Sequence, residues 1–313
     1  MTAVTFRAEA ISEPRYTGLL TVAPSAVGDV EALVERFDDY REQLATLVGN
    51  VVTIYRAAED LPTLDPGDDA IRLLHVSDLH NNPQGYDLVA QLAADFEVDV
   101  VVDTGDISDW GTTPEAQLVE RIDDIDAPYI FVRGNHDSGR IERAIGRQGA
   151  TVLDNEATDV AGLRIWGAGD PRFTPDKQED DDDDAQRQVI ESFAVEVDDL
   201  VAADDPESID LIALHDPGAA VELEDDVPLV LAGHRHEPDA VELGSTLVLV
   251  EGSTGGAGLR GLQGEEATPL SASVLYFDPG TDELVAYDSV TVDGFGGSAV
   301  RIERHVVDRL DGG

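Results

Sequence analysis

The sequence predicts an α/β fold in which a sandwich of two β-sheets forms the core and helices flank it. Short, continuous apolar runs begin at Ile71, as expected for strands that are buried on both faces. Segments with helical patterning separate the first three runs, which gives a β-α-β-α-β order. Later runs resemble strands joined by short turns with less helix between them, so two layers of sheet are expected.

The first part of the chain differs from the rest. Residues 27–58 place apolar side chains at helical spacing and predict one long amphipathic helix. The following segment, LPTLDPGDD (61–69), is rich in Pro, Gly and Asp and predicts a linker. We therefore expect residues 1–70 to form an N-terminal extension and residues 71–313 to form the main domain.

Nine apolar runs predict the strands of the main domain. In chain order they are IRLLHV, VDVVVDT, PYIFVR, LRIWGAG, IDLIAL, VPLVLA, TLVLVEG, SASVLYFD and ELVAYDSVTV. Residues 87–96 and 115–125 have helical patterning. The acidic run 176–188 fits either a solvated loop or the start of a helix that continues through VIESFAVEVDDLVA. The glycine-rich stretch 252–264 fits either a flexible surface loop or a backbone approach to a phosphate.

The charge balance is strongly acidic. The chain has 66 acidic and 20 basic residues, a formal net charge of -46, and Lys177 as its single lysine. Concentrated cations would screen the self-repulsion of such a surface, so the composition is typical of a protein from a salt-in halophile. An acidic disordered chain is the alternative, but 42% apolar residues in strand-like runs argue against it. Because clustered Lys and Arg are absent, nucleic acid and anionic membranes are not expected partners.

The residue types restrict metal chemistry and location. The chain has no cysteine, so disulfides and Cys-ligated zinc are excluded, and any metal must be held by nitrogen and oxygen ligands. The first residues lack a basic region followed by an apolar core, and no run approaches 18 apolar residues. We therefore expect a cytoplasmic protein without a membrane segment.

Polar residues follow five of the apolar runs. Residues after the carboxyl ends of strands in an α/β sheet converge on one crevice, so these five places predict a shared site. Five of the seven histidines lie there, whereas His75 lies inside the first strand and His305 in the tail, where structural roles are expected. The motifs are Asp78-Leu79-His80, Gly105-Asp106, Gly134-Asn135-His136-Asp137, His215 and Gly233-His234-Arg235-His236.

In this order the motifs match the pattern D-x-H, G-D, G-N-H-D/E, H and G-H-x-H, so residues 71–255 resemble the calcineurin-like metallophosphoesterase superfamily. The charge suggests a haloarchaeal member. The resemblance implies a four-layer fold and two divalent metal ions, with Mn²⁺ expected and Fe or Zn²⁺ as alternatives. It assigns Asp78, His80 and His236 to one metal and Asn135, His215 and His234 to the other, with Asp106 bridging.

The resemblance also implies a reaction. Two metal ions about 3.5 to 4 Å apart lower the pKa of a water between them, so a hydroxide can attack phosphorus at neutral pH. His136 has no place among the ligands, so it is expected to face the substrate and either protonate the leaving oxygen or stabilise the charge that develops there. Asp109 matches an aspartate that orients this histidine in related phosphatases. Its simpler interpretation is a solvated loop acid.

The resemblance implies a small-molecule phosphoester as the substrate, and a phosphodiester is expected. Trp110 occupies the position where protein Ser/Thr phosphatases carry a phosphate-binding arginine, which argues against that branch. A phosphomonoesterase for a nucleotide or sugar phosphate is one alternative, and a non-catalytic scaffold with this fold is another. A DNA nuclease is opposed by the charge. Arg235 fits either a phosphate contact or an ion pair, and Asp137 and Asp216 are candidate partners for histidines.

Overall fold

The computed structural model describes residues 69–175, 183–204, 206–256, 268–293 and 299–307, with isolated positions at 48, 49, 52, 67 and 258. The predicted N-terminal helix and linker fall almost entirely outside the described residues, so the division at residue 70 stays a prediction. Lys177 and the first part of the acidic run also lie outside them, as does most of the second half of the glycine-rich stretch.

The first sheet combines parallel and antiparallel strands. Within the described residues it has the order β13-β12-β11-β1-β2-β3-β4, in which β1 to β4 run parallel and β11 to β13 pair antiparallel. Its strands are β1 (Ile71–Val76), β2 (Val100–Asp103), β3 (Tyr129–Phe131), β4 (Thr151–Val152), β11 (Leu270–Phe277), β12 (Leu284–Val292) and β13 (Val300–Val306).

The second sheet has a parallel centre and antiparallel edges. Its order in the described chain is β5-β6-β7-β8-β10-β9, in which β6, β7, β8 and β10 are parallel. Its strands are β5 (Glu156–Val160), β6 (Leu163–Gly167), β7 (Leu211–Ala213), β8 (Leu229–Ala232), β9 (Asp239–Leu243) and β10 (Thr246–Val250).

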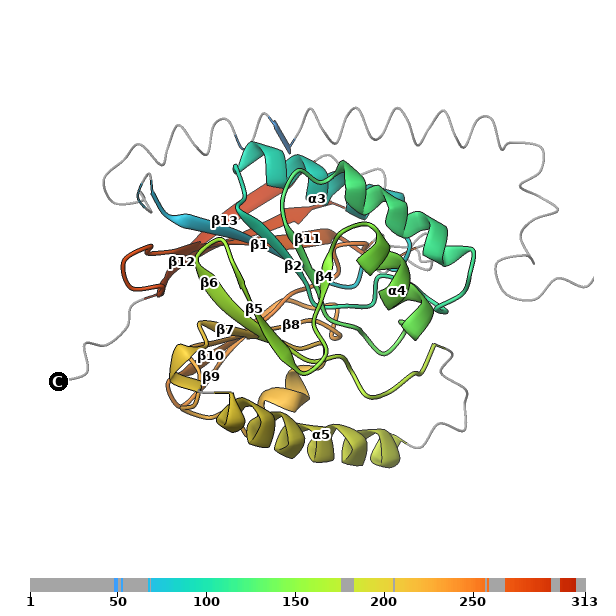
Figure 1. Cartoon of the computed structure of the whole chain (residues 1–313). Helices are drawn as coiled ribbons and strands as arrows, with labels where there is room; N and C mark the ends of the chain where they lie inside the picture. Colours follow the sequence, from blue (N-terminus) through green and yellow to red (C-terminus); the bar gives the residue numbers. More distant parts are fainter. Residues whose placement is uncertain are drawn as a thin grey trace, which may run out of the picture. The chain divides into compact units, whose positions relative to one another are not determined.

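Helices cover the outer faces of the two sheets (Figure 1). The helices α3 (Pro83–Asp95) and α4 (Gly139–Arg147) and the 3-10 helix η3 (Glu115–Asp124) lie on the side of the first sheet. On the other side, α5 (Asp183–Ala203) and the 3-10 helix η5 (Pro217–Ala220) cover the second sheet, and η4 (Pro206–Ser208) follows α5. The expected four-layer α/β sandwich is confirmed.

Two apolar cores hold the layers together. Leu73, Val102 and Ile130 of the first sheet pack against Ile165 and Leu231 of the second. A further core joins the other face of the second sheet to α5 and contains Trp166, Phe193, Val197, Val230 and Val248. Strands β7 and β8 are buried on both faces, which explains why their sequences are continuously apolar.

Local signals explain where the helices begin. The Asn82 side chain accepts a hydrogen bond from Gln84 N, and Pro83 occupies the first turn, so α3 starts before the predicted 87–96. The segment predicted as a helix over 115–125 forms the 3-10 helix η3. Helix α5 begins at Asp183, so the helical interpretation holds for the end of the acidic run. Helix α4 and strands β4, β5, β9 and β13 were not predicted.

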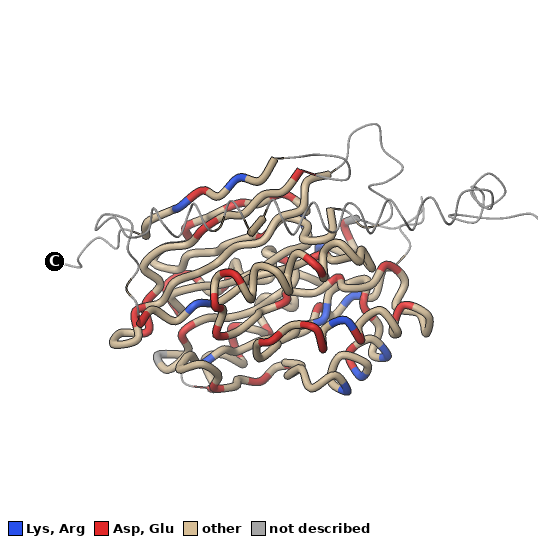
Figure 2. Tube along the Cα trace, turned by 90° about the horizontal axis from the view of Figure 1, so that it is seen from above, with Lys and Arg blue, Asp and Glu red and all other residues tan. Residues whose placement is uncertain are grey.

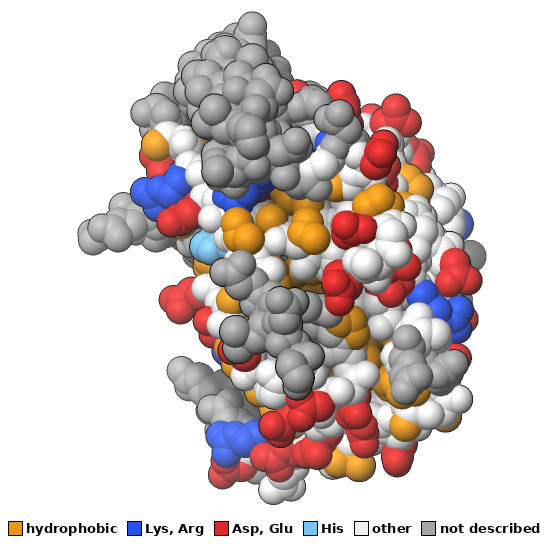
Figure 3. Space-filling model, turned by 90° about the vertical axis from the view of Figure 1, so that its left-hand side faces the viewer, with side chains coloured by type: hydrophobic (Ala, Val, Ile, Leu, Met, Phe, Trp, Pro, Cys, Tyr) orange, Lys and Arg blue, Asp and Glu red, His pale blue; other side chains and the backbone are white. Residues whose placement is uncertain are grey.

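Acidic residues are spread along strands, loops and helices in the described part of the chain, and basic residues are few (Figure 2). On the face shown in Figure 3, Asp and Glu again outnumber Lys and Arg, with apolar side chains between them. Because the charge is dispersed over the molecule, it acts on folding as a general self-repulsion.

Candidate metal centre

The candidate site lies at the carboxyl ends of central strands from both sheets. The loops after β1, β2 and β3 come from the first sheet, and the loops after β7 and β8 come from the second. Backbone hydrogen bonds tie them together, since Asp78 N donates to Gly105 O at 2.8 Å and Gly233 N donates to His215 O at 2.9 Å. The loops bring together the predicted ligands, which are Asp78, His80, Asp106, Asn135, His215, His234 and His236.

The first group of candidate ligands consists of Asp78, His80 and His236. The Nε2 atoms of the two rings lie 3.0 Å apart. Oδ1 of Asp78 lies 3.1 Å from His236 Nε2 and 3.7 Å from His80 Nε2. One ligand atom of each residue therefore faces a common point.

The second group consists of Asp106, His215 and His234, with Asn135 beside them. His215 Nε2 lies 3.2 Å from Asp106 Oδ2, 3.1 Å from His234 Nδ1 and 3.0 Å from Asn135 Oδ1. By distance Asp106 belongs to this group. The two groups contain residues that the sequence motifs assign to two metal ions, and both that assignment and the bridging position of Asp106 stay predictions.

The backbone at these residues is strained. Five candidate ligands have left-handed φ angles although they are not glycine: Asp78 (55°), His80 (46°), Asp106 (56°), His234 (71°) and His236 (57°). Such conformations cost free energy and persist only where surrounding contacts enforce them, and they cluster at functional sites. The strained conformations of these loops therefore lower the stability of the fold, and they orient the ligand side chains.

Two motif glycines are required by close packing. A Cβ atom at Gly233 would overlap Ser77 Oγ and crowd the Asp78 carboxylate, and one at Gly134 would overlap Asp106. Gly233 is therefore more than an ordinary turn residue, because it lets the loop after β8 press against the loop after β1.

Burial and charge set opposite protonation states within the site. Burial would raise the pKa of Asp78, but the neighbouring rings of His236 and His80 hold it well below its usual range. Burial would likewise lower the pKa of His80, yet the neighbouring carboxylates of Asp109 and Asp78 raise it to about 10. Desolvation and the neighbouring His215 lower the pKa of His234 to about 4. The site thus favours positive charge between its carboxylates.

These residues fit divalent metal ions. Asp78 Oδ1 is buried and has no hydrogen-bond partner among the described residues. Metal binding needs both Nε2 atoms of His80 and His236 unprotonated, and at 3.0 Å their lone pairs would then repel each other unless a cation lies between them. Carboxylate, amide and imidazole donors suit transition metals such as Mn²⁺, Fe and Zn²⁺. The groups support divalent metal binding.

His136 lies beside the candidate ligands. Its Nε2 is 3.9 Å from Asp106 Oδ2, and its backbone N donates to Asp106 Oδ1 at 2.8 Å. It is buried with 8% of its surface exposed, and it belongs to neither candidate group.

Asp109 lies between His80 and His136 and presents a different oxygen atom to each ring. His136 Nδ1 lies 2.9 Å from the carbonyl oxygen of Asp109, whereas Asp109 Oδ1 lies 3.1 Å from His80 Nδ1. The cause is Glu115, whose Oε1 accepts hydrogen bonds from the backbone N atoms of Asp109 and Trp110. This turns the loop so that the Asp109 carbonyl faces His136 and the carboxylate faces His80. Asp109 is a buried residue and not a solvated loop acid.

Sequence reasoning missed two residues that organise the site. Glu115 also accepts from Asn81 Nδ2 at 2.8 Å and from Thr112 N at 2.7 Å. The spacing Thr112-x-x-Glu115 has the form of a capping box just before η3, whose own N-cap is Pro114, and could have indicated these contacts of Glu115. Thr174 Oγ1 lies 2.8 Å from Asn135 Nδ2 and fixes the amide orientation, for which the sequence offers no signal.

The two other candidate partners of histidines differ from each other. Asp137 accepts hydrogen bonds from the backbone N atoms of Asp106, Ser108 and Gly134. These bonds join the loop after β2 to the loop after β3, and none of them involves a histidine side chain. Burial raises the pKa of Asp137 to about 6, and the charge of Asp106 acts in the same direction. Asp216 Oδ2 does face a histidine, since it lies 3.7 Å from His234 Nε2.

The remaining sequence candidates lie elsewhere or make other contacts. His75 is buried in β1, and its Nε2 lies 3.1 Å from Thr104 Oγ1. Burial lowers its pKa to about 3, so a neutral structural ring fits this position. His305 stacks on Tyr287 in β12. Arg235 forms a long ion pair with Asp239 at 3.6 Å, and half of its side chain is exposed.

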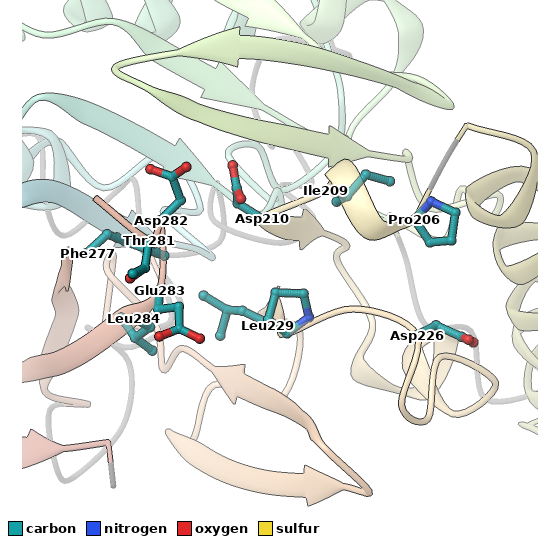
Figure 4. A pocket seen from close by; sticks show the side chains of 11 residues that line it. Pro206, Ile209, Asp210, Asp226, Leu229, Phe277, Thr281, Asp282, Glu283 and Leu284 are labelled. Carbon is teal, nitrogen blue, oxygen red and sulfur yellow. The ribbon is translucent and has the colours of Figure 1, made fainter. Parts of the chain in front are cut away.

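A separate pocket lies at the other end of the second sheet (Figure 4). Ile209 and Asp210 precede β7 and Pro228 precedes β8, so the pocket adjoins the amino ends of the strands whose carboxyl ends carry the candidate ligands. It contains none of those ligands.

Among the described residues, no helix is long and apolar enough to cross a bilayer.

The fold and the site together define a class of protein, an α/β sandwich with a histidine- and carboxylate-rich centre between its sheets. The sequence matches the family described as calcineurin-like phosphoesterase over residues 71–238. Because this match covers more than half of the chain, the chain belongs to that family. Family membership and the two candidate groups support a metal-dependent phosphoesterase.

The other comparisons are more distant. No curated protein matches the sequence significantly. A solved archaeal phosphodiesterase has 13% identity, with 71% of this chain and 100% of that chain covered and a TM-score of 0.41. Zinc-complexed Vps29 from Entamoeba histolytica has 14% identity, coverages of 75% and 99% and a TM-score of 0.38. GAP50 from Plasmodium, described as an anchor in the inner membrane complex, has 12% identity, coverages of 77% and 90% and a TM-score of 0.48.

Proposed function

We propose that the chain is a dinuclear metal-dependent phosphoesterase that hydrolyses phosphodiesters. The observation that carries the proposal is the meeting of two groups of ligand atoms, each group lying within 4.8 Å, at the carboxyl ends of strands from both sheets. Asp78, His80 and His236 would hold one ion, and Asn135, His215 and His234 would hold the other. Asp106 would contact both, and Mn²⁺ is the expected metal.

A bound pair of divalent ions would neutralise phosphoryl oxygens and lower the pKa of a water near phosphorus. The remaining tasks fall to the chain. His136 would donate a proton to the leaving oxygen, since it lies beside Asp106 but belongs to neither ligand group. The Asp109 carbonyl holds the ring at Nδ1, which leaves Nε2 as the atom that can face a substrate.

The proposal is tested by metal content and hydrolysis measured on one preparation. Protein purified in molar KCl and loaded with Mn²⁺ should contain two metal ions per chain and should hydrolyse phosphodiesters. Asp106→Ala should lose more metal than a change at any other candidate ligand, because only this carboxylate would contact both ions. Asp126→Ala, at an exposed loop carboxylate, is the matched control.

Each alternative predicts a different result. A phosphomonoesterase would prefer the monoesters of the same substrate panel. A non-catalytic scaffold would hydrolyse neither class, with or without bound metal. If Asp106→Ala keeps two metal ions per chain, the bridging assignment is wrong.

A further inference from the structure

Exposed aromatic side chains are concentrated beside the candidate site. Of the aromatic residues in the described part of the chain, Trp110 and Phe173 alone are exposed, with 43% and 52% of their surfaces accessible. The others are buried or, for Tyr287, half-buried. Exposing a large apolar side chain to water is unfavourable, so exposed aromatic residues on two loops next to the candidate site indicate a binding surface.

Trp110 is held next to the first candidate ligand group. It follows Asp109, whose carboxylate lies 3.1 Å from His80 Nδ1 and whose carbonyl oxygen lies 2.9 Å from His136 Nδ1. Trp110 N donates to Glu115 Oε1 at 3.0 Å, and the next residue, Gly111, accepts a hydrogen bond from Ser138 Oγ. The backbone on either side of the indole is therefore fixed while the ring is partly open to solvent.

Phe173 is held in the same way next to the second group. Thr174 N donates to Asn135 O at 2.8 Å, and Thr174 Oγ1 accepts from the Asn135 amide at 2.8 Å. On the other side, Arg172 Nη2 donates to Asp216 Oδ2 at 2.7 Å, and this carboxylate lies 3.7 Å from His234 Nε2. The two exposed rings thus lie on two loops, each one residue away from groups that contact candidate ligands or His136.

The charge of the chain favours uncharged contacts with a substrate. A net charge of -46 repels an anionic phosphoester at long range, and molar salt weakens what basic side chains can contribute. Stacking on an aromatic ring does not depend on charge and survives high salt. Contacts with Trp110 and Phe173 would therefore raise the affinity for a phosphoester that carries a planar neutral group. The surrounding surface cannot provide this affinity by electrostatic attraction.

Resting on the proposed function, we infer that Trp110 and Phe173 bind the nucleobase of a nucleoside phosphodiester. A nucleoside is an alcohol that carries a planar, uncharged heteroaromatic group at a short distance from its phosphate. A sugar phosphate or a glycerol phosphate offers no such group to the two rings.

The first test compares two diesters with identical reacting groups, adenosine 5′-(methyl phosphate) and ribose 5-(methyl phosphate), in molar KCl with Mn²⁺. The wild type should prefer the adenosine diester in kcat/KM. Trp110→Ala and Phe173→Ala should each reduce this preference by about tenfold, the usual worth of stacking one base on one aromatic ring. Trp110→Phe should restore part of it. Val195→Ala, at an exposed apolar residue on α5, is the control and should leave the ratio unchanged.

The second test needs no turnover. The chain has two tryptophans, and Trp166 is buried with 1% exposure, so quenching of indole fluorescence by added AMP would report on Trp110. Phe173→Ala should weaken AMP binding about tenfold. Trp110→Phe should abolish the signal. Phenyl phosphate in the same titration distinguishes a nucleobase site from a site for any aryl ester.

The outcomes separate this inference from the proposed function. If both diesters are hydrolysed with equal kcat/KM, the nucleobase inference is overturned while the phosphoesterase stands. Equal affinity for AMP and phenyl phosphate would also overturn it. If the metal-loaded protein hydrolyses neither diester, the proposed function fails and this inference fails with it.

Discussion

Replacing Asp109 by Asn tests the arrangement that the structure gives to its carboxylate. Asp109 Oδ1 lies 3.1 Å from Nδ1 of His80, a ring whose Nε2 faces the first candidate ligand group. A carboxylate in this position fixes the ring orientation and makes the imidazole a stronger metal ligand. We expect Asp109→Asn to weaken metal binding in this group while the Asp109 carbonyl continues to hold His136.

The expected size follows from the distance and the charge. Two unit charges 3.1 Å apart interact by about 5 kcal/mol at an effective dielectric constant of about 20. The loss is smaller, because a ligating imidazole carries only part of a positive charge and the Asn oxygen still presents a partial negative charge to the ring. Removal of such supporting partners typically weakens metal affinity about 10- to 100-fold. The loss of metal affinity should lie near the lower end of this range for Asp109→Asn and near the upper end for Asp109→Ala.

Titration of the metal-free protein with Mn²⁺ in molar KCl measures this effect. One binding step should weaken and the other should stay near the wild type, and Asp126→Ala should leave both unchanged. Turnover at saturating Mn²⁺ should be largely restored, because His136 keeps its backbone partner. Unchanged Mn²⁺ affinity with a permanent loss of turnover would refute this reasoning and would support a carboxylate that orients His136.

Three further predictions concern His136, salt and pH. His136→Gln should keep the metal content but lower turnover by about 10² to 10⁴, with the largest loss on esters of poor leaving groups. The midpoint of thermal unfolding should rise as KCl increases to molar concentration, because the Debye length falls from about 10 Å to about 3 Å. Mn²⁺ affinity should rise with pH from about 6 to 8, because the pKa of His80 is raised to about 10 and Mn²⁺ must displace its proton.

Each of these has an opposing result. Loss of metal in His136→Gln would make His136 a ligand, and an equal loss on all esters would indicate charge stabilisation in place of proton donation. Equal unfolding midpoints at low and molar KCl would contradict the halophilic prediction. Mn²⁺ affinity that is constant over this pH range would mean that His80 loses no proton when metal binds.

Strand-end motifs made the location of the site predictable. Parallel strands direct their carboxyl ends to one edge, so residues after β1, β2 and β3 had to converge whatever the side-chain packing was. The two candidate ligand groups, one with Asp78 and the other with Asp106, likewise consist of residues that follow strand ends. The pairing of the strands was harder to predict, since β11 pairs with β1 across about 200 residues of chain and short edge strands such as β4 carry weak patterns.

The sequence by itself determined the fold class, the acidic surface and the set of residues that meet at the strand ends, because these depend on local periodicity and composition. Only the tertiary structure decided which groups contact one another within that set. Asp109 contacts His80 with its carboxylate and His136 with its carbonyl, and Glu115 sets this orientation from six residues further along the chain. Such choices depend on loop geometry and on contacts between distant segments, which no pattern of neighbouring residues specifies.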